Sequence, residues 1–365
     1  MRAAGLRSMN SGAWSRPVFN LNLCAWRSIR SRHREPIDRA LELRFYLTGS
    51  MLSALGMLQE RLYRRTFDQL DLRPPLFLVG HWRSGTTLLH ELLALDESFA
   101  APSTYACFNP HHFLLTRHHA PSMKQLARPT GDMSVSPFSP QEEEFALLCM
   151  GATSPYEAFV FPSALRQFEA LCDPELFERA QQQKWNDAIT WILKATACLR
   201  GADKRLLVKS PANSFRIPRL SALFPGAMFI RLVREPCAVF ASTLKLWQGM
   251  WERYALAAPL AQEVLIERIL ETRLTLERRL KSSLRNLPAD RTVTIRYEEL
   301  VADPCGTIER LYERLALGDP SALLPKVSAY MAQHPRSATR SGEDWRQLLE
   351  ARWPELFDEF GYAPG

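Results

Sequence analysis

The sequence lacks the features that mark several classes of protein. Its seven cysteines are odd in number, scattered along 365 residues, and never form a C-x-x-C pair. This pattern indicates buried thiols in a reducing compartment rather than a disulfide framework. The most apolar stretch, residues 52–58, is short and interrupted, so no window resembles a membrane-spanning helix, and no signal-peptide core lies near the start. No motif that recognises DNA or RNA is present, so nucleic acid is not an expected partner.

Acidic residues are missing from the first 34 positions, which contain seven arginines. We favour a poorly ordered basic tail or a segment that contacts anionic lipid. An organelle transit peptide has the same composition and stays open as an alternative. The formal charge of +7 suits an anionic nucleotide, but it also suits a membrane surface. We therefore expect a cytoplasmic protein, with peripheral membrane contact through its basic N-terminus as an open alternative.

The most informative motif lies in residues 75–89, which read PLFLVGHWRSGTTLL. An apolar run with the length of a buried strand leads into a loop bounded by Gly80 and Gly85, and leucines on helical spacing follow. This order is typical of a phosphate cradle, because loop N–H groups and a helix N-terminus converge on an anion. The glycines fit the G-x-x-x-x-G frame of the P-loop, but Thr86 replaces the expected lysine and Thr87 follows. The loop is predicted to hold a phosphate without that lysine.

This loop resembles the 5′-phosphosulfate-binding loop of sulfotransferases that use 3′-phosphoadenosine 5′-phosphosulfate (PAPS). In that family, a basic residue and a Ser-Gly-Thr-Thr run hold the 5′-phosphate of the nucleotide. The matching residues here are Arg83, Ser84, Gly85, Thr86 and Thr87. The resemblance implies that PAPS is the co-substrate and that the reaction needs no metal.

A second segment, residues 227–247, combines a predicted strand with a helix that starts at Pro236. Arg234 ends the strand, and Ser242 follows eight residues later. An arginine offers a rigid fork to a phosphate dianion, and a serine two turns into the helix adds a hydroxyl donor. The pair resembles the family's 3′-phosphate motif, which implies that Arg234 and Ser242 bind the ribose 3′-phosphate.

A third segment, residues 205–213, is a short predicted strand that ends in a polar loop. Lys209 and Ser210 match a Lys-Ser/Thr element that faces the sulfonate in many relatives. The resemblance implies that Lys209 neutralises the charge that builds up on the bridging oxygen. Relatives often carry a histidine in this loop that acts as the base, but none is present here.

Two segments of the sequence offer candidates for the base that deprotonates the acceptor, and the choice between them stays open. Glu143 and Glu144 lie in a Gln-Glu-Glu-Glu run, where a carboxylate with a pKa raised by burial could serve, although these acids could equally just start a helix. Consecutive helical residues diverge by about 100°, so glutamates 142–144 cannot all face one site. His111 and His112 are the other candidates, because their proline-rich loop is expected over the edge of the sheet where ligands bind.

Strands that alternate with helices predict an α/β protein with a P-loop-like three-layer fold and a central parallel sheet. Residues 1–72 are predicted to be a basic N-terminal extension with a helical arm over 36–70. Residues 73–365 are predicted to form the sulfotransferase domain, with a PAPS-binding core over about 74–317 and a C-terminal helix that reaches 365. A strand and turn over 291–304 also resemble the family, so the resemblance covers most of the chain.

These segments predict an enzyme that transfers a sulfonate from PAPS to a hydroxyl or amine of a small-molecule, lipid or carbohydrate acceptor. A degenerate P-loop kinase or NTPase is the first alternative, but it would need a lysine after Gly85 and an acidic Mg²⁺ site at a strand end, and neither is visible. A non-catalytic nucleotide-binding scaffold is the second. The acceptor and the oligomeric state are left open.

Overall fold

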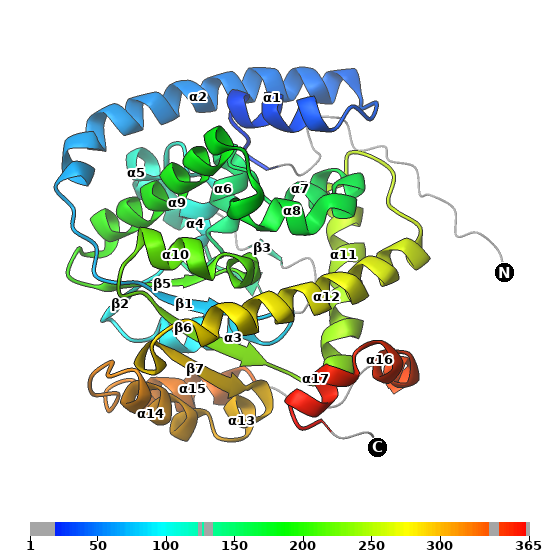
Figure 1. Cartoon of the computed structure of the whole chain (residues 1–365). Coiled ribbons are helices and arrows are strands. Elements are labelled where there is room, and N and C mark those ends of the chain that lie inside the picture. Colours follow the sequence, from blue (N-terminus) through cyan, green and yellow to red (C-terminus); the bar gives the residue numbers. More distant parts are fainter. Residues whose placement is uncertain (1–18, 123–125, 128–133, 336–342, 363–365) are drawn as a thin grey trace.

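A five-stranded parallel sheet forms the centre of the protein (Figure 1). The computed structural model describes residues 19–122, 126–127, 134–335 and 343–362. The strand order is β2-β5-β1-β6-β7, and all neighbouring strands are parallel. The strands are β1 (Leu76–Val79), β2 (Phe99–Ala100), β5 (Arg205–Lys209), β6 (Met228–Val233) and β7 (Thr292–Arg296). The predicted parallel sheet is confirmed.

Strand residues alternate between two hydrophobic cores, one on each face of the sheet. In β1, Phe77 and Val79 belong to the larger core, whereas Leu76 and Leu78 belong to the smaller one. Successive side chains of a strand point to opposite faces, and a parallel sheet is normally covered on both. Apolar residues at every position of β1 therefore specify a central strand with helices on either side, which is the predicted three-layer fold.

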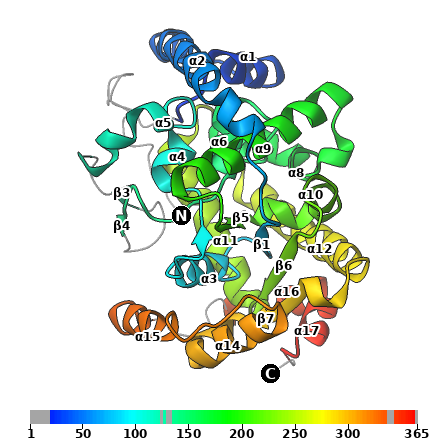
Figure 2. The same ribbon diagram turned by 90° about the vertical axis from the view of Figure 1, so that its left-hand side faces the viewer.

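Helices cover both faces of the sheet (Figures 1 and 2). The face drawn upward in Figure 1 carries α4 (Thr104–Phe108), α5 (Phe113–Thr116), α6 (Glu144–Met150), α7 (Glu157–Val160), α8 (Phe168–Cys172), α9 (Arg179–Arg200), α10 (Ile217–Leu223) and α12 (Gln262–Arg285). The other face carries α3 (Thr86–Leu93), α13 (Tyr297–Ala302), α14 (Pro304–Arg314) and α15 (Leu324–Gln333). Helix α11 (Pro236–Tyr254) runs across the layers at one side, and β3 (Leu126–Ala127) pairs with β4 (Ser134–Val135) in a separate hairpin.

Two N-terminal helices, α1 (Leu23–Arg32) and α2 (Arg39–Asp68), form an outer layer that we call the arm. Helix α2 lies within the segment predicted to be a helical arm over 36–70, and the Asp38 side chain caps it by accepting from a backbone N–H at 2.9 Å. Trp26 of α1 stacks on Phe45 of α2 with ring centroids 4.0 Å apart, and both belong to the larger core. The arm is therefore packed onto the α/β core. Residues 1–18, with part of the predicted basic tail, lie outside the described residues.

The C-terminal region differs from the single helix that the sequence suggested. It contains two short helices, α16 (Arg346–Arg352) and α17 (Pro354–Glu359). Pro354 has no N–H to donate, and it disfavours helical geometry at Trp353, so the first helix ends there. Residues 363–365 lie outside the described part of the chain. Among the described helices, none is long and apolar enough to cross a membrane.

Candidate active site

The loop between β1 and α3 makes a tight turn at the carboxyl end of the central strand. Gly80 and Gly85 have φ angles of 142° and 100°, which favour glycine. A Cβ atom at Gly80 would lie 2.5 Å from the carbonyl oxygen of Leu232, and one at Gly85 would overlap the ring of Tyr297. Arg83 has a φ of 70°, which is uncommon for a residue with a side chain and occurs most often at functional sites. The loop conformation is thus fixed by its neighbours.

Unused donors converge at this loop. The carbonyl of Gly85 accepts from N–H groups inside α3, whereas the N–H groups of Thr86 and Thr87 begin the helix and have no acceptor within it. The hydroxyl of Ser84 is buried and has no hydrogen-bond partner among the described residues. Leaving a buried hydroxyl without a partner costs free energy. The loop therefore fits an anionic ligand that accepts from these groups.

The two phosphate-binding segments predicted from the sequence meet in the structure. The Nε of Arg83 donates to the hydroxyl of Ser242 at 2.7 Å. The guanidinium of Arg234 donates to the backbone carbonyl of Arg83 at 3.3 Å and lies over the ring of Tyr297, 4.1 Å from its centroid. We call residues 83–87, Arg234 and Ser242 the donor edge. The carboxyl ends of β1 and β6, which are adjacent parallel strands, bring its two halves together.

Lys209 stands next to the donor edge at the end of β5, on the other side of β1. Its Nζ donates to the hydroxyl of Thr87 at 3.3 Å and pairs with Glu142 at 2.6 Å. The Lys209 side chain is 3% exposed and that of Glu142 is 15% exposed. The hydroxyl of Tyr156 also donates to Glu142, and burial raises the pKa of Tyr156 well above its usual value, so it stays a donor. A cation and a partly exposed carboxylate thus lie together beside the loop.

The other two glutamates of the acidic run lie beneath this pair. Glu143 is fully buried and accepts from Asn213 at 2.6 Å, and burial followed by the charge of Glu144 raises its pKa to about 7. Glu144 is also fully buried, pairs with Arg216 through both oxygens, and accepts from Ser154 at 2.6 Å. Their hydrogen bonds go to interior residues, and Lys209 pairs with neither of them. The structure brings Glu142 to Lys209 instead.

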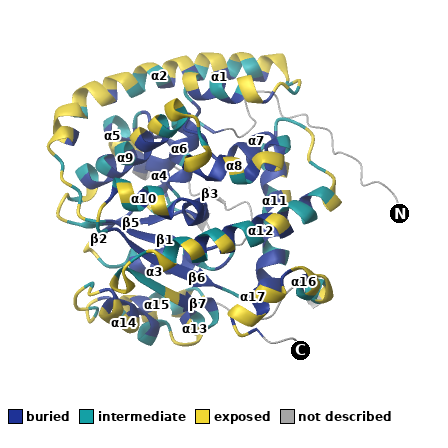
Figure 3. Ribbon diagram, in the orientation of Figure 1, coloured by how far each residue is buried: buried dark blue, intermediate teal, exposed yellow. Residues whose placement is uncertain are grey.

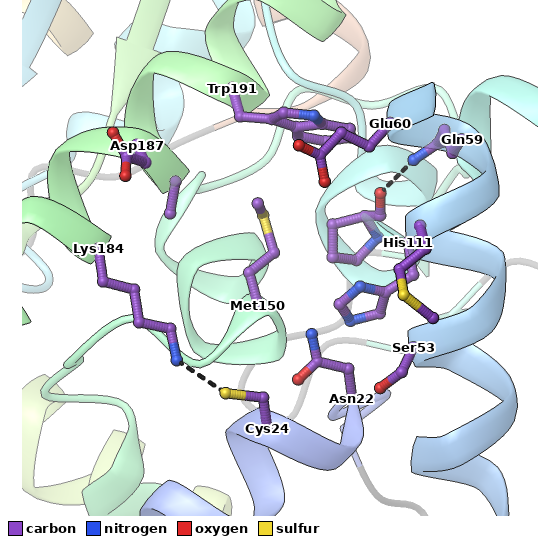
Figure 4. A pocket seen from close by; sticks show the side chains of 14 residues that line it. Asn22, Cys24, Ser53, Gln59, Glu60, His111, Met150, Lys184, Asp187 and Trp191 are labelled. Carbon is purple, nitrogen blue, oxygen red and sulfur yellow. Dashed lines mark hydrogen bonds between the residues drawn. The ribbon is translucent and has the colours of Figure 1, made fainter. Parts of the chain in front are cut away.

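His111 lies at a different place from the donor edge. Its Nε2 bonds to the backbone carbonyl of Cys149 at 3.0 Å, at the opposite end of α6 from the glutamates, and burial lowers its pKa to about 4. Its ring faces a cavity of about 400 Å³ between α2 and α9, where Gln59 and Lys184 also lie (Figure 4). No residue of the donor edge lines this cavity. The geometry therefore does not bring His111 to Lys209.

A glycine loop on a parallel sheet, with two basic segments converging on it and a lysine beside it, is the arrangement expected of a sulfotransferase. The model of the family described as "Sulfotransferase family" matches residues 74–320. The chain belongs to the sulfotransferase family, and the resemblance recognised over about 74–317 is confirmed. Membership supports a sulfotransferase over a P-loop kinase or NTPase and over a non-catalytic scaffold, and it implies a sulfate donor as co-substrate.

Two similar proteins carry the same name, omega-hydroxy-beta-dihydromenaquinone-9 sulfotransferase Stf3, in Mycobacterium bovis and Mycobacterium tuberculosis. Each is 33% identical over 360 residues, which cover 96% of this chain and 92% of the relative. Among solved structures, sulfotransferase STF1 from Mycobacterium tuberculosis H37Rv has a TM-score of 0.65 and 19% identity, with 91% of this chain and 90% of that chain covered. Sulfotransferase STF9 from Mycobacterium avium has a TM-score of 0.61 and 16% identity, with 93% and 97% covered. These two structures share the fold.

Sequence reasoning missed Glu142 and Tyr156. The sequence shows the acidic run and implies that its members diverge, but it does not reveal where the helix begins. Helix α6 starts at Glu144, so Glu142 precedes it and turns toward Lys209. Tyr156 carried no signal beyond its place in an aromatic stretch, because its contact with Glu142 spans 14 residues and depends on how α6 and α7 pack.

Proposed function

We propose that this chain transfers the sulfonate group of PAPS to a hydroxyl group of a menaquinone-type lipid. The observation that carries the donor is the meeting of Arg83, Ser242 and Arg234 beside a loop whose buried Ser84 hydroxyl finds no hydrogen-bond partner in the described part of the chain. When bound, PAPS supplies the sulfonate and a nucleotide with two phosphate positions. Two separate clusters of donors on one edge suit such a ligand better than a nucleotide that has a single phosphate chain.

In this proposal, different residues of the donor edge bind the two phosphates of the nucleotide. Ser84, Gly85, Thr86 and Thr87 hold the 5′-phosphate side through hydroxyl and backbone N–H groups. Arg234 and Ser242 hold the 3′-phosphate, and the aromatic face of Tyr297 keeps the Arg234 guanidinium plane oriented. Arg83 links the two sides because its side chain bonds to Ser242 and its carbonyl accepts from Arg234.

Lys209 and Glu142 provide charge and proton transfer in the proposed mechanism. Lys209 holds a positive charge next to Thr87, where negative charge develops on the oxygen that leaves, and a fixed charge in a water-poor site stabilises a transition state strongly. Glu142 accepts the proton of the acceptor hydroxyl. Tyr156 is a positioning residue that orients the Glu142 carboxylate. Glu142 is thus our first candidate for the base, in place of Glu144 and His111. Glu143 stays the second candidate, because its pKa of about 7 suits a base although its carboxylate is buried.

The acceptor proposal comes from the similar proteins rather than from the site. Their name specifies a hydroxylated menaquinone, and the match covers nearly the whole length of both chains. A relative at this identity supports the same class of acceptor, a long-chain lipid with a terminal hydroxyl. The small-molecule and carbohydrate acceptors left open by the sequence are therefore less favoured.

Two measurements test donor and acceptor separately. The first is a calorimetric titration of the full chain with adenosine 3′,5′-bisphosphate, and absence of binding would sink the donor assignment. The second is transfer of labelled sulfonate from PAPS to a detergent-dispersed menaquinone that carries a terminal hydroxyl. A labelled lipid product supports the acceptor, whereas normal nucleotide binding without labelled lipid overturns only the acceptor.

The base is tested by comparing Glu142→Gln with Glu143→Gln in the same transfer assay. Removing a general base typically costs about 10²–10⁴-fold in rate. We expect that loss in kcat for Glu142→Gln, with binding of the bisphosphate retained, and a much smaller loss for Glu143→Gln. The reverse order would assign the base to Glu143.

A further inference from the structure

Helix α2 carries apolar side chains on two opposite faces. Its inward face includes Leu41, Phe45 and Leu52, which are buried in the larger core or against it. A second stripe runs along the other side at spacings of four and seven residues: Leu43, Leu47, Met51, Leu58 and Leu62, all about half exposed. At 3.6 residues per turn, the two sets point in directions roughly 140° apart. The stripe therefore cannot be explained by packing against this chain's own core.

Exposed large apolar side chains are concentrated on this one helix. The described residues include ten of them, and seven lie on α2: the five of the stripe, with Tyr46 and Met57 on the flank of the helix. Figure 3 shows the outer surface of α2 exposed along its length, at the outermost layer of the molecule. Single exposed apolar residues are normal, but a contiguous patch marks an interaction surface. What this patch contacts must be decided by its surroundings.

Arginines border the stripe on the same side of the helix. Arg39, Arg61 and Arg65 are exposed, and none of them forms an ion pair within the described part of the chain. Arg64 lies on the flank of α2, where it lines a cavity together with residues of α9. Asp68 is the one acid that points to this side, because Glu42 and Glu60 lie toward the flank. We call the five stripe residues and Arg39, Arg61 and Arg65 the outward face of α2. An apolar stripe with a basic border along a single long helix is the pattern of a helix that lies in a lipid interface.

We propose that the outward face of α2 docks this protein onto an anionic lipid membrane. The stripe would enter the boundary between headgroups and acyl chains, while the arginines contact anionic headgroups. A helix of 30 residues is about 45 Å long, which is long enough to lie along the membrane surface. A second copy of this chain is a poorer partner, because pairing two outward faces brings arginines of both copies together in either orientation.

Membrane docking by the outward face of α2 is independent of the proposed reaction. It would bring the enzyme to the place where a lipid acceptor resides, but binding to vesicles is measurable without PAPS or acceptor. A failure of sulfonate transfer and a failure of membrane docking are therefore separate results.

The test is co-sedimentation of the full chain with vesicles, either of phosphatidylcholine alone or of two parts phosphatidylcholine and one part phosphatidylglycerol. We expect binding to the anionic vesicles that weakens as salt rises. Arg61→Glu with Arg65→Glu should weaken it by at least on the order of thirty-fold, since each arginine near such a surface contributes roughly fivefold. Leu47→Gln with Leu58→Gln should weaken it by about tenfold or more.

Matched controls lie on other surfaces. Arg285→Glu with Arg314→Glu makes the same change in net charge on exposed residues of α12 and α14, and Leu176→Gln removes an exposed leucine outside the arm. Both should bind vesicles like the wild type. Equal loss in the controls, or no binding by the wild type, would overturn the proposal. So would a wild-type dimer in sedimentation velocity that becomes monomeric in the leucine variant, because the face would then be an interface between copies.

Discussion

The donor edge and the arm are built on different principles. The donor edge joins residues that are far apart in the sequence, such as Arg83 and Ser242, and its residues are buried or half-buried, with hydrogen bonds that link its two segments. The arm is a pair of consecutive helices that contact each other and the core, and its outer side is apolar and basic. One region is organised to surround a ligand, and the other presents a surface. Changes in the first should alter chemistry and folding, whereas changes in the second should alter location.

The largest difference should appear in turnover. Lys209→Met removes the charge beside Thr87, and loss of one such electrostatic group typically costs about 10²–10³-fold in kcat. Lys184→Met is the matched change next to the arm. Within the described part of the chain, the Lys184 side chain forms a hydrogen bond only to the thiol of Cys24. Steady-state kinetics should show the loss for Lys209→Met alone. Similar kcat values for the two variants would remove Lys209 from the mechanism.

Stability should separate the two regions next. Glu144→Gln leaves Arg216 buried without its counter-charge, and breaking a buried pair in this way costs about 3–5 kcal/mol of the free energy of unfolding. Glu42→Gln breaks the pair of Glu42 with Arg30 on the arm, which is partly exposed, and should cost about 1 kcal/mol or less. Urea unfolding of both variants measures the difference. Equal losses in the free energy of unfolding would mean that the buried pair of Glu144 with Arg216 does not stabilise the fold more than the exposed pair on the arm.

Glu143 predicts how stability depends on pH. Its pKa is raised from 4.5 to about 7 in the folded protein, so the folded state keeps a proton that the unfolded state loses above pH 4.5. Stability should therefore fall as pH rises from 4.5 to about 7, by on the order of 3 kcal/mol at most. Glu143→Gln should remove this contribution, so that unfolding curves of variant and wild type diverge across that range. Parallel curves would show that Glu143 titrates normally.

The smallest effect is expected on the arm. Leu47→Gln changes an exposed side chain, so the free energy of unfolding should change by no more than about 0.5 kcal/mol. Calorimetry should show unchanged affinity for adenosine 3′,5′-bisphosphate. A large loss of either quantity would mean that the outward face of α2 is part of the folded core or of the donor edge.

The sequence predicts one of these regions better than the other. The sheet, the phosphate loop, Lys209, Arg234 and Ser242 follow from motifs, because a strand, a tight turn and a helix N-terminus are local structures with local signals. The sequence does not predict which glutamate of the acidic run faces Lys209, because this depends on where α6 begins. The sequence does not predict the outward face of α2 either. The apolar residues of α2 recur on helical spacing, but this spacing does not show which of them the core buries. Pro354 was visible in the sequence, and it divides the C-terminal helix for a local reason.

The central claim is that the donor edge recognises a nucleotide with a separate 3′-phosphate. Titrating Arg234→Ala and wild type with adenosine 3′,5′-bisphosphate and with AMP tests it most directly, because the two ligands differ only in that phosphate. A charge-assisted contact of this kind contributes about 1.5–3 kcal/mol, so the variant should lose roughly ten- to a hundred-fold in affinity for the bisphosphate while its affinity for AMP barely changes. Equal losses for the two ligands would contradict the account.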